Sequence, residues 1–217
     1  EIQKEPKGIA EAFLIGEKFI NHNPVALILG DNLFHGEDLI NKLKKCTQTN
    51  ISTIFAYQVH DPERYGVIEF ANTGKVISIE EKPKNPKSSY AITGLYFYDK
   101  TVVEKAKMIK PSERGELEIT DINQMYLSED NLKVELLSRG MAWLDTGTCD
   151  SLHEASSYIK TIEHRQGLKV GCPEEIALKN GWINSEQLNS LAIKISKNGY
   201  GKYLISLNNE HKRALNI

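Results

Sequence analysis

The fold is decided by residues 25–32, Val-Ala-Leu-Ile-Leu-Gly-Asp-Asn. Five consecutive apolar residues stop at a Gly-Asp-Asn turn signal, a pattern typical of a strand that is buried on both faces, as in parallel sheets. Apolar residues at helical spacing precede this strand at 8–20, and a second helix at about 37–46 leads to another β-rich run at 51–59. The alternation of helix and strand predicts α/β architecture.

The pattern changes after residue 66. Residues 67–80 read as a β-hairpin with a turn at Asn72-Thr73-Gly74, and 90–98 as a strand in which Gly94 marks a bulge or a close approach of another part of the chain. Further helices are expected at 101–109 and 117–127, strands at 134–138 and 141–144, and only helices afterwards, at 151–166, from Pro173, at 185–195 and at 198–207. We therefore expect an α/β sheet domain over 1–148 and a helical C-terminal subdomain over 149–217.

Composition excludes several classes of protein. The 27 Lys and Arg against 29 Asp and Glu give a net charge of -2, too little positive charge for electrostatic capture of nucleic acid. No apolar run approaches the roughly 20 residues that span a bilayer. From the charged opening we expect no signal peptide. The three cysteines, Cys46, Cys149 and Cys172, are too far apart for a metal or disulfide motif. We expect a cytoplasmic protein without nucleic-acid or membrane partners.

Two aspartates follow apolar strands. Asp31 stands behind Gly30, where open α/β sheets bind ligands, and a carboxylate there suits Mg²⁺, which takes one or two carboxylates together with phosphates and waters. Asp145 repeats this pattern in 141–148, Met-Ala-Trp-Leu-Asp-Thr-Gly-Thr. The two are far apart in sequence and can meet only through the sheet. Each alone fits a helix cap or a turn equally well.

Three further motifs are polar. In Glu80-Glu81-Lys82, one carboxylate and the ammonium could bind a sugar hydroxyl and a phosphate, or form an exposed charge cluster at a strand end. Gly66, in the turn 61–67, would let a backbone N–H approach a ligand, and Arg114 stands near a helix start that favours anions. Both are equally explained as turn and cap chemistry. The residues alone thus indicate an α/β protein with a site for Mg²⁺, phosphate and sugar.

Seven blocks together resemble a known family. They are GIAEAFLIGEKFI (8–20), LILGDNLFHG (27–36), FAYQVHDPERYGVIEF (55–70), SIEEKPKNPKSSYAITGLYFYD (78–99), RGELEITDIN (114–123), AWLDTGT (142–148) and RQGLKVGCPEEIA (165–177). The resemblance is to the sugar nucleotidyltransferases, specifically to the bacterial glucose-1-phosphate thymidylyltransferase branch, and covers essentially the whole chain. It implies a Rossmann-like, glycosyltransferase-A-like mixed sheet flanked by helices.

The resemblance also implies a reaction. Glucose 1-phosphate would attack the α-phosphorus of dTTP with Mg²⁺, giving dTDP-glucose and pyrophosphate, the first step of dTDP-sugar (dTDP-rhamnose) biosynthesis. A sugar phosphate is an ionised nucleophile at neutral pH, so catalysis would consist of positioning and charge neutralisation rather than general-base chemistry.

The family's functional residues carry over onto matching positions. Asp31 and Asp145 match the Mg²⁺ ligands, and Lys82, as a third catalytic residue, matches the lysine beside the sugar phosphate and the α-phosphate. Gln3 and Gly8 match the residues that read thymine, and Trp143 the aromatic beside the metal aspartate. Glucose 1-phosphate contacts match Asn32, Tyr65, Gly66, Glu81, Ile92, Tyr96 and Arg114. The resemblance further implies a homotetramer whose regulatory nucleotide site includes Gly36, Arg139, Glu175 and Ile176.

One family signature does not occur in this sequence. The glycine-rich G-G-x-G-T-R-L-x-P loop, whose arginine and lysine hold the triphosphate, is absent, and the sequence opens without methionine. By the family pattern roughly 80 residues, a few βαβ units, would precede Glu1. We therefore expect a truncated portion that is inactive and poorly soluble by itself. Two alternatives stay open: a UTP- or ATP-using relative, and a non-catalytic regulatory or decayed paralogue.

Overall fold

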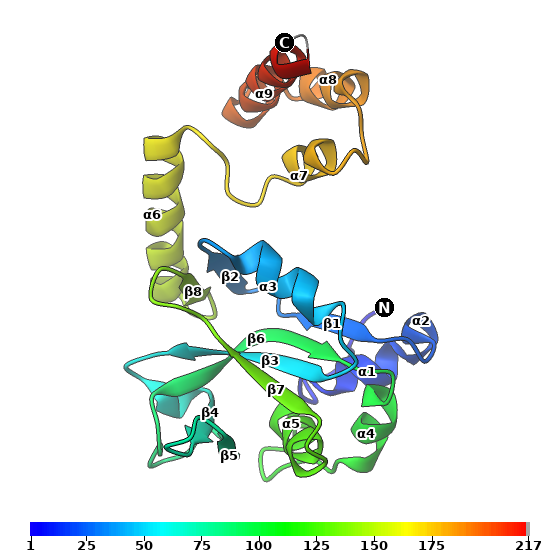
Figure 1. Cartoon of the computed structure of the whole chain (residues 1–217), viewed down its shortest axis with the longest axis vertical. Coiled ribbons are helices and arrows are strands. Elements are labelled where there is room, and N and C mark those ends of the chain that lie inside the picture. The colour runs from blue at the N-terminus through cyan, green and yellow to red at the C-terminus, as the bar shows by residue number, and fades with distance from the viewer. Residues whose placement is uncertain (216–217) are drawn as a thin grey trace. The chain divides into compact units, whose positions relative to one another are not determined.

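The computed structural model describes residues 1–215 and divides into two compact units (Figure 1). One comprises Glu1–Thr148 and the other begins at Cys149. Within the described residues, no helix combines the length and the apolar character that crossing a membrane requires.

A mixed sheet forms the centre of the first unit. Its strands run in the order β5-β4-β6-β3-β7, and β1 pairs with β6 beside this path. Among the strands of the described residues, only the β3–β7 pair in this sheet is parallel, and the other pairs are antiparallel. This confirms the expected mixed α/β sheet. The strands are β1 (Val25–Ile28), β3 (Ser52–Gln58), β4 (Gly66–Phe70), β5 (Val76–Glu81), β6 (Tyr90–Tyr98) and β7 (Leu132–Leu136).

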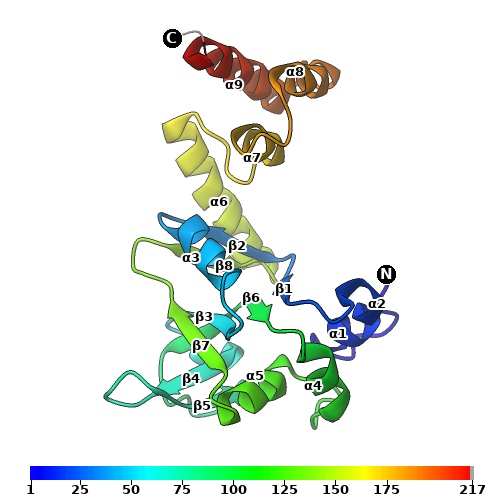
Figure 2. The same cartoon turned by 45° about the vertical axis from the view of Figure 1, so that its right-hand side comes forward.

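Strand β6 separates two hydrophobic clusters. Side chains alternate between the faces of a strand, so Ile92 and Tyr96 join one cluster while Ala91 and Leu95 join the other. Helices pack on both faces, as Figure 2 shows. The first face carries α1 (Glu11–Ile15), α2 (Glu17–Ile20), α4 (Val102–Met108) and α5 (Ile119–Ser128), and the second carries α3 (Leu39–Cys46).

A second, two-stranded sheet lies on the same side as α3. Strands β2 (Asn32–His35) and β8 (Ala142–Asp145) pair antiparallel, with Asn32 opposite Asp145. Strand β2 is absent from the sequence prediction. Because β2 follows Asp31 directly and α3 begins only at Leu39, Asp31 is not the cap of a helix.

Two expectations for the start of the chain are wrong. Strand β1 is antiparallel to β6 and half exposed rather than buried on both faces, with Ile28 59% exposed. Among residues 1–215, β1 hydrogen-bonds only to β6 and its outer face is uncovered, so its apolar run is not matched by burial. The single helix expected at 8–20 is two short helices that meet at Gly16, a residue that disfavours a helix interior.

The second unit is helical. It contains α6 (Cys149–Gln166), α7 (Pro173–Lys179), α8 (Ser185–Lys194) and α9 (Gly199–Leu215). Leu188, Ala192 and Leu204 are fully buried in its core. Pro173 occupies the first turn of α7, as predicted, and α8 begins with a capping box between Asn184 and Gln187.

Candidate functional site

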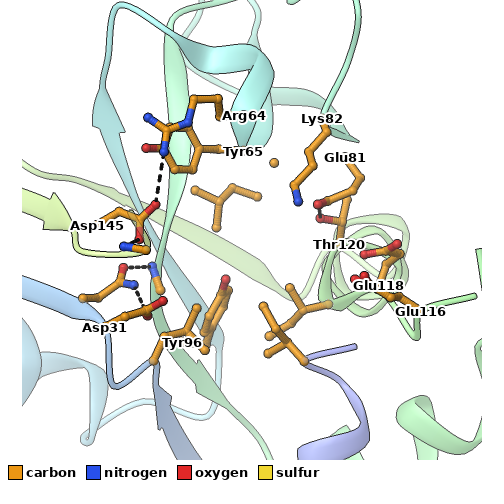
Figure 3. Close-up of a pocket in the computed structure, with 18 of the residues that line it drawn as sticks. Asp31, Arg64, Tyr65, Glu81, Lys82, Tyr96, Glu116, Glu118, Thr120 and Asp145 are labelled. Atoms are coloured by element: carbon orange, nitrogen blue, oxygen red, sulfur yellow. Dashed lines mark hydrogen bonds and ion pairs between the residues drawn. The ribbon is translucent and has the colours of Figure 1, made fainter. Parts of the chain in front are cut away.

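A cavity of about 550 Å³ opens in the first unit between the small sheet, strand β6 and the start of α5 (Figure 3). Many of the residues singled out from the sequence line it, although they come from distant segments. They are Asp31, Asn32, Tyr65, Gly66, Glu81, Lys82, Ile92, Tyr96, Arg114, Trp143 and Asp145.

The two aspartates reach this cavity through the small sheet and not through the main one. Asp145 ends β8 and lies opposite Asn32, the residue after Asp31. The carbonyl of Asp31 accepts hydrogen bonds from the backbone N–H and the hydroxyl of Thr146, both at 2.8 Å. These bonds hold the two acidic residues at one end of the β2–β8 pair.

The donor set suits a hard cation such as Mg²⁺. Two carboxylates, Asp31 and Asp145, face one cavity (Figure 3). Within residues 1–215 no group of three or more His, Cys, Asp or Glu residues has the geometry of a metal cage. Mg²⁺ is commonly bound by one or two carboxylates while substrate phosphates and waters supply the remaining oxygens. The residues present therefore fit this ion.

Arg64 stands beside the aspartates. Its Nη1 donates to Oδ2 of Asp61 at 2.8 Å, its Nη2 lies 3.8 Å from Oδ2 of Asp145, and its guanidinium lies 5.2 Å from the ring centre of Tyr65. The hydrogen bond to Asp61 raises the pKa of Arg64. The 3₁₀ helix η1 (Pro62–Arg64) positions this side chain at the cavity wall.

The opposite wall carries an ion-pair network. One Nη of Arg114 bonds to both carboxylate oxygens of Glu118 at 2.9 Å and lies 3.3 Å from Glu116 and 3.5 Å from Glu81. The hydrogen bonds to Glu118 raise the pKa of Arg114. The hydroxyl of Thr120 donates to Glu81. Glu81 is thereby held in one orientation beside the cavity.

Lys82 differs from the two arginines. Its ammonium points into the cavity (Figure 3), and in the described part of the chain no carboxylate lies within ion-pair distance of it. Its backbone N–H donates to the carbonyl of Tyr65 at 3.0 Å, and its φ of 42° is left-handed. Lys82 thus offers an uncompensated positive charge to a ligand.

Aromatic side chains and a glycine form another part of the cavity wall. The rings of Tyr65 and Trp143 meet edge to face at 5.1 Å, and burial raises the pKa of Tyr65. Tyr96 is 4% exposed. At Gly66 a Cβ would lie 3.2 Å from Oγ1 of Thr120, so the missing side chain keeps this part of the cavity open.

Gln3 and Gly8 do not line the cavity. Nε2 of the exposed Gln3 donates to the carbonyl of Gly8 at 3.1 Å and to Glu11 at 2.7 Å. Gly8 has a φ of +98° and packs against Leu117, where a Cβ would lie 2.3 Å from the carbonyl oxygen. Their neighbour Ile9 does reach the cavity. Gln3 and Gly8 thus lie together, on the segment that precedes the lining residue Ile9.

The four residues expected at a regulatory site fall in different units. Gly36 packs on Gly140 and Met141, next to Arg139, in the first unit. Glu175 and Ile176 belong to α7 in the second unit. The carboxylate of Glu175 accepts from the Tyr203 hydroxyl and pairs with Lys179.

Several lining residues were not singled out from the sequence. Glu116, Glu118 and Thr120 lay inside the block RGELEITDIN, and Arg64 inside PERYG, but only Arg114, Tyr65 and Gly66 were selected from these blocks. The other missed residues are Ile9, Leu29, Ile119, Gly147 and Thr148. Gly94 was expected to shape the backbone of its strand but not to line the site. Alternating polarity at a helix start was the available signal for Glu116 and Glu118.

This chain is similar in sequence to a known protein family and to several named proteins. The nucleotidyl transferase family matches residues 1–162. Glucose-1-phosphate thymidylyltransferase of Neisseria meningitidis is 54% identical over 207 residues, which are 95% of this chain and 72% of the relative. The enzyme of that name from Mycobacterium tuberculosis strain H37Rv is 52% identical over 94% of this chain and 71% of its own length.

Solved structures of nucleotidyl transferases also resemble this chain. A chain from Bacillus anthracis, provisionally named glucose-1-phosphate thymidylyltransferase and bound to sucrose, has a TM-score of 0.64 and 42% identity over 73% of this chain. A UDP-glucose pyrophosphorylase with UDP-glucose has a TM-score of 0.65 and 25% identity over 73% of this chain. This chain covers 63% and 64% of those two chains, respectively. The protein therefore belongs to the glucose-1-phosphate thymidylyltransferase family of nucleotidyl transferases.

Proposed function

We propose that this protein serves nucleotidyl transfer from dTTP to α-D-glucose 1-phosphate, which yields dTDP-glucose and pyrophosphate. One observation carries the proposal: Asp31 and Asp145 lie on the wall of a single cavity that is also lined by Lys82, which has no ion-pair partner among residues 1–215. This combination offers carboxylates for a divalent cation and an ammonium for a phosphate, and relatives with 50–55% identity bear the name of this enzyme.

The chemistry requires placement rather than an activated side chain. An oxygen of the sugar phosphate attacks the α-phosphorus of dTTP, the bond from that phosphorus to the bridging oxygen breaks, and pyrophosphate leaves with the bond's electrons. The attacking oxygen is already ionised, so no residue must remove a proton. Lys82 would orient the sugar phosphate and offset its charge. Glu81, held by Thr120, would accept hydrogen bonds from sugar hydroxyls.

Asp31 and Asp145 would hold Mg²⁺. When bound, the ion would offset the negative charge of the phosphates and template their arrangement. The protein supplies the separation of the two carboxylates through the β2–β8 pairing and their orientation through neighbouring N–H groups, including the N–H of Gly147 at 3.1 Å from Asp145. Trp143 stands beside them as part of the wall.

The choice of nucleotide is assigned to Gln3 and Gly8. The amide of Gln3 can pair with the donor and acceptor edge of thymine if it releases Glu11, its present partner. UTP is the alternative donor, since a similar fold at 25% identity belongs to a UDP-glucose pyrophosphorylase. Assembly as a homotetramer, with Gly36, Arg139, Glu175 and Ile176 at a regulatory nucleotide site, also stays a proposal.

Binding is the first test, because the printed sequence contains no G-G-x-G-T-R-L loop for a triphosphate. Glucose 1-phosphate is titrated into the 217-residue chain in a calorimeter with Mg²⁺, next to galactose 1-phosphate and inorganic phosphate. We expect glucose 1-phosphate to bind most tightly. A second assay measures pyrophosphate release with dTTP, UTP or ATP in the longest available form of the protein. Failure to bind glucose 1-phosphate would contradict the proposal, and release with UTP alone would reassign the nucleotide.

A further inference from the structure

The side-chain amide of Asn32 joins three strands at the edge of the cavity. Its Oδ1 accepts a hydrogen bond from the backbone N–H of Gly94 in β6 at 2.9 Å and another from Nε1–H of Trp143 in β8 at 2.6 Å. Its Nδ2 donates to Oδ1 of Asp31 at 2.9 Å. Both lone pairs of the amide oxygen are used within the protein, and the chemistry determines the orientation of the amide, because Gly94 and Trp143 present only donors.

The backbone at Gly94 is shaped to admit this amide. A Cβ on Gly94 would lie 2.6 Å from Oδ1 of Asn32 and 2.8 Å from Cδ1 of Leu29. The β3–β6 register shifts between Ile54 and Ala56, next to this point of β6. Such an irregularity takes N–H groups out of the ladder, and the amide of Asn32 accepts one of them.

We propose that Asn32 is a positioning residue for the metal aspartates, an inference that rests on the nucleotidyl transfer proposed above. Asp31 precedes Asn32 in the chain, and Asp145 lies opposite Asn32 in the β2–β8 pair. Of the three hydrogen bonds of Asn32, the one from Gly94 ties the small sheet to β6, whose Ile92 and Tyr96 line the same cavity. The other two link Asn32 to Asp31 and to Trp143 of β8. The amide thereby sets the place of both carboxylates relative to the sugar-phosphate side.

An amide orients a carboxylate without neutralising it. A lysine or arginine at position 32 would place a positive charge against Asp31 and compete with a metal ion for it. The N–H of Asn32 instead restricts the rotation of the carboxylate and leaves its full charge available. In proteins, groups that orient a metal ligand in this way contribute 10–100-fold to metal affinity. This role differs from the direct sugar-phosphate contact that the resemblance implies for Asn32.

The same amide also anchors the aromatic wall. Trp143 is 7% exposed, so its Nε1–H needs a partner inside the protein. Its ring contacts Tyr65, and the carbonyl of Tyr65 holds the backbone of Lys82. Loss of the Asn32 amide should therefore alter the positions of both aspartates and of Lys82 across the cavity.

The test uses Mn²⁺ alone as the probe, with its affinity measured by electron paramagnetic resonance on the 217-residue chain without substrates. We expect Asn32→Ala to bind Mn²⁺ about 10-fold more weakly than the parent, the low end of the effect of orienting groups because Asp31 is exposed. Asp31→Asn should lose binding at this site. Asn41→Ala is the matched control: Nδ2 of Asn41 also donates to an aspartate, Asp38, at 3.0 Å, but neither residue lines the cavity. It should bind like the parent.

A second measurement reports on the hydrogen bond between Asn32 and Trp143. Trp182→Phe leaves Trp143 as the single tryptophan of the chain, and in that background Asn32→Ala should shift the emission of Trp143 to the red. Asn32→Ser, whose hydroxyl is too short to reach all three partners, carries the same expectations if Asn32→Ala does not fold. The inference is overturned if both Asn32 variants bind Mn²⁺ within twofold of the parent while Asp31→Asn does not bind. If Asp31→Asn binds like the parent, the metal site of the proposed function fails first, and the role of Asn32 fails with it.

Discussion

Replacing Lys82 by glutamine removes a positive charge from the cavity wall and keeps most of the length of the side chain. In the described structure no carboxylate pairs with this ammonium, so the substitution leaves no buried partner unsatisfied. The substitution should therefore change only the affinity for an anionic ligand. The site thus allows a direct measurement of how much this charge contributes to binding of the sugar phosphate.

The expected size follows from the environment of Lys82. An ammonium and a phosphate charge at about 4 Å attract by about 4 kcal/mol at an effective dielectric constant of about 20. Lys82 is exposed, and solvent screening together with desolvation reduces this to the 1.5–3 kcal/mol, roughly, of a hydrogen bond to a charged group. We therefore expect the Kd for glucose 1-phosphate to rise about 10- to 150-fold.

Calorimetric titration of glucose 1-phosphate into parent and variant measures this change. The difference should shrink as ionic strength rises, because salt screens an exposed charge pair. Lys84→Gln is the control: it removes the same charge two residues away, from an exposed side chain that does not line the cavity. If Lys82→Gln and Lys84→Gln both bind within twofold of the parent, Lys82 does not hold the phosphate and its assignment is refuted.

Three further predictions concern Asp145, Gln3 and Gly8. Asp145→Asn should weaken Mn²⁺ binding about 10-fold or more with an unchanged melting temperature, because an amide lacks the ligand charge; a retained Mn²⁺ affinity would contradict it. In the longest available form of the protein, Gln3→Ala should raise KM for dTTP about 10-fold, the loss of one or two hydrogen bonds, and leave KM for glucose 1-phosphate unchanged; a parallel rise of both would make Gln3 structural. Gly8→Ala should destabilise the protein by about 2 kcal/mol or more in denaturant unfolding, through its φ of +98° and a Cβ only 2.3 Å from Leu117 O. Gly74→Ala, with a φ of +82° and open space around it, should cost less, and equal losses would refute the clash at Gly8.

The central strand could be predicted closely from the sequence. Residues 90–98 are rich in aromatic and β-branched side chains and are bounded by polar residues, and they form β6 with those limits. Gly94 was expected to mark a bulge or a close approach, and both occur: the register of β3–β6 shifts nearby, and the side chain of Asn32 lies against Gly94. Local composition was sufficient here because the strand is buried on both faces.

The small sheet could not be predicted in the same way. Strand β2 has four residues, Asn-Leu-Phe-His, all half-buried, and a strand of this length has little preference of its own. Its partner β8 lies more than a hundred residues later in the chain. The sequence therefore identified Asp31 and Asp145 separately, each as a residue at the end of a strand. It predicted that the main sheet would bring them together, whereas the β2–β8 pair does so.

For strand β1 the sequence predicted more burial than the structure shows. Five apolar residues in a row predicted burial on both faces, but the run establishes only which side chains are apolar and not whether another element covers them. Within residues 1–215, β1 contributes one face to the core through Val25 and Leu27, while Ala26 and Ile28 are exposed. Periodicity could identify the strand, but its neighbours decide its burial.

The charge balance of the cavity depends on ion pairs that cannot be read from the spacing of residues in the sequence. The lining carboxylates, Asp31, Glu81, Glu116, Glu118 and Asp145, outnumber the lining cations, Arg64, Lys82 and Arg114. Arg114 is surrounded by three of these carboxylates, and Arg64 is shared between Asp61 and Asp145. Lys82, the one lining cation without a carboxylate partner among residues 1–215, is then left to meet an anion, on the wall opposite two aspartates whose charges a phosphate would otherwise face. If the site works as proposed, a phosphate ligand is favoured only together with a cation at Asp31 and Asp145, and we expect the acidic pair and Lys82 to act as one site.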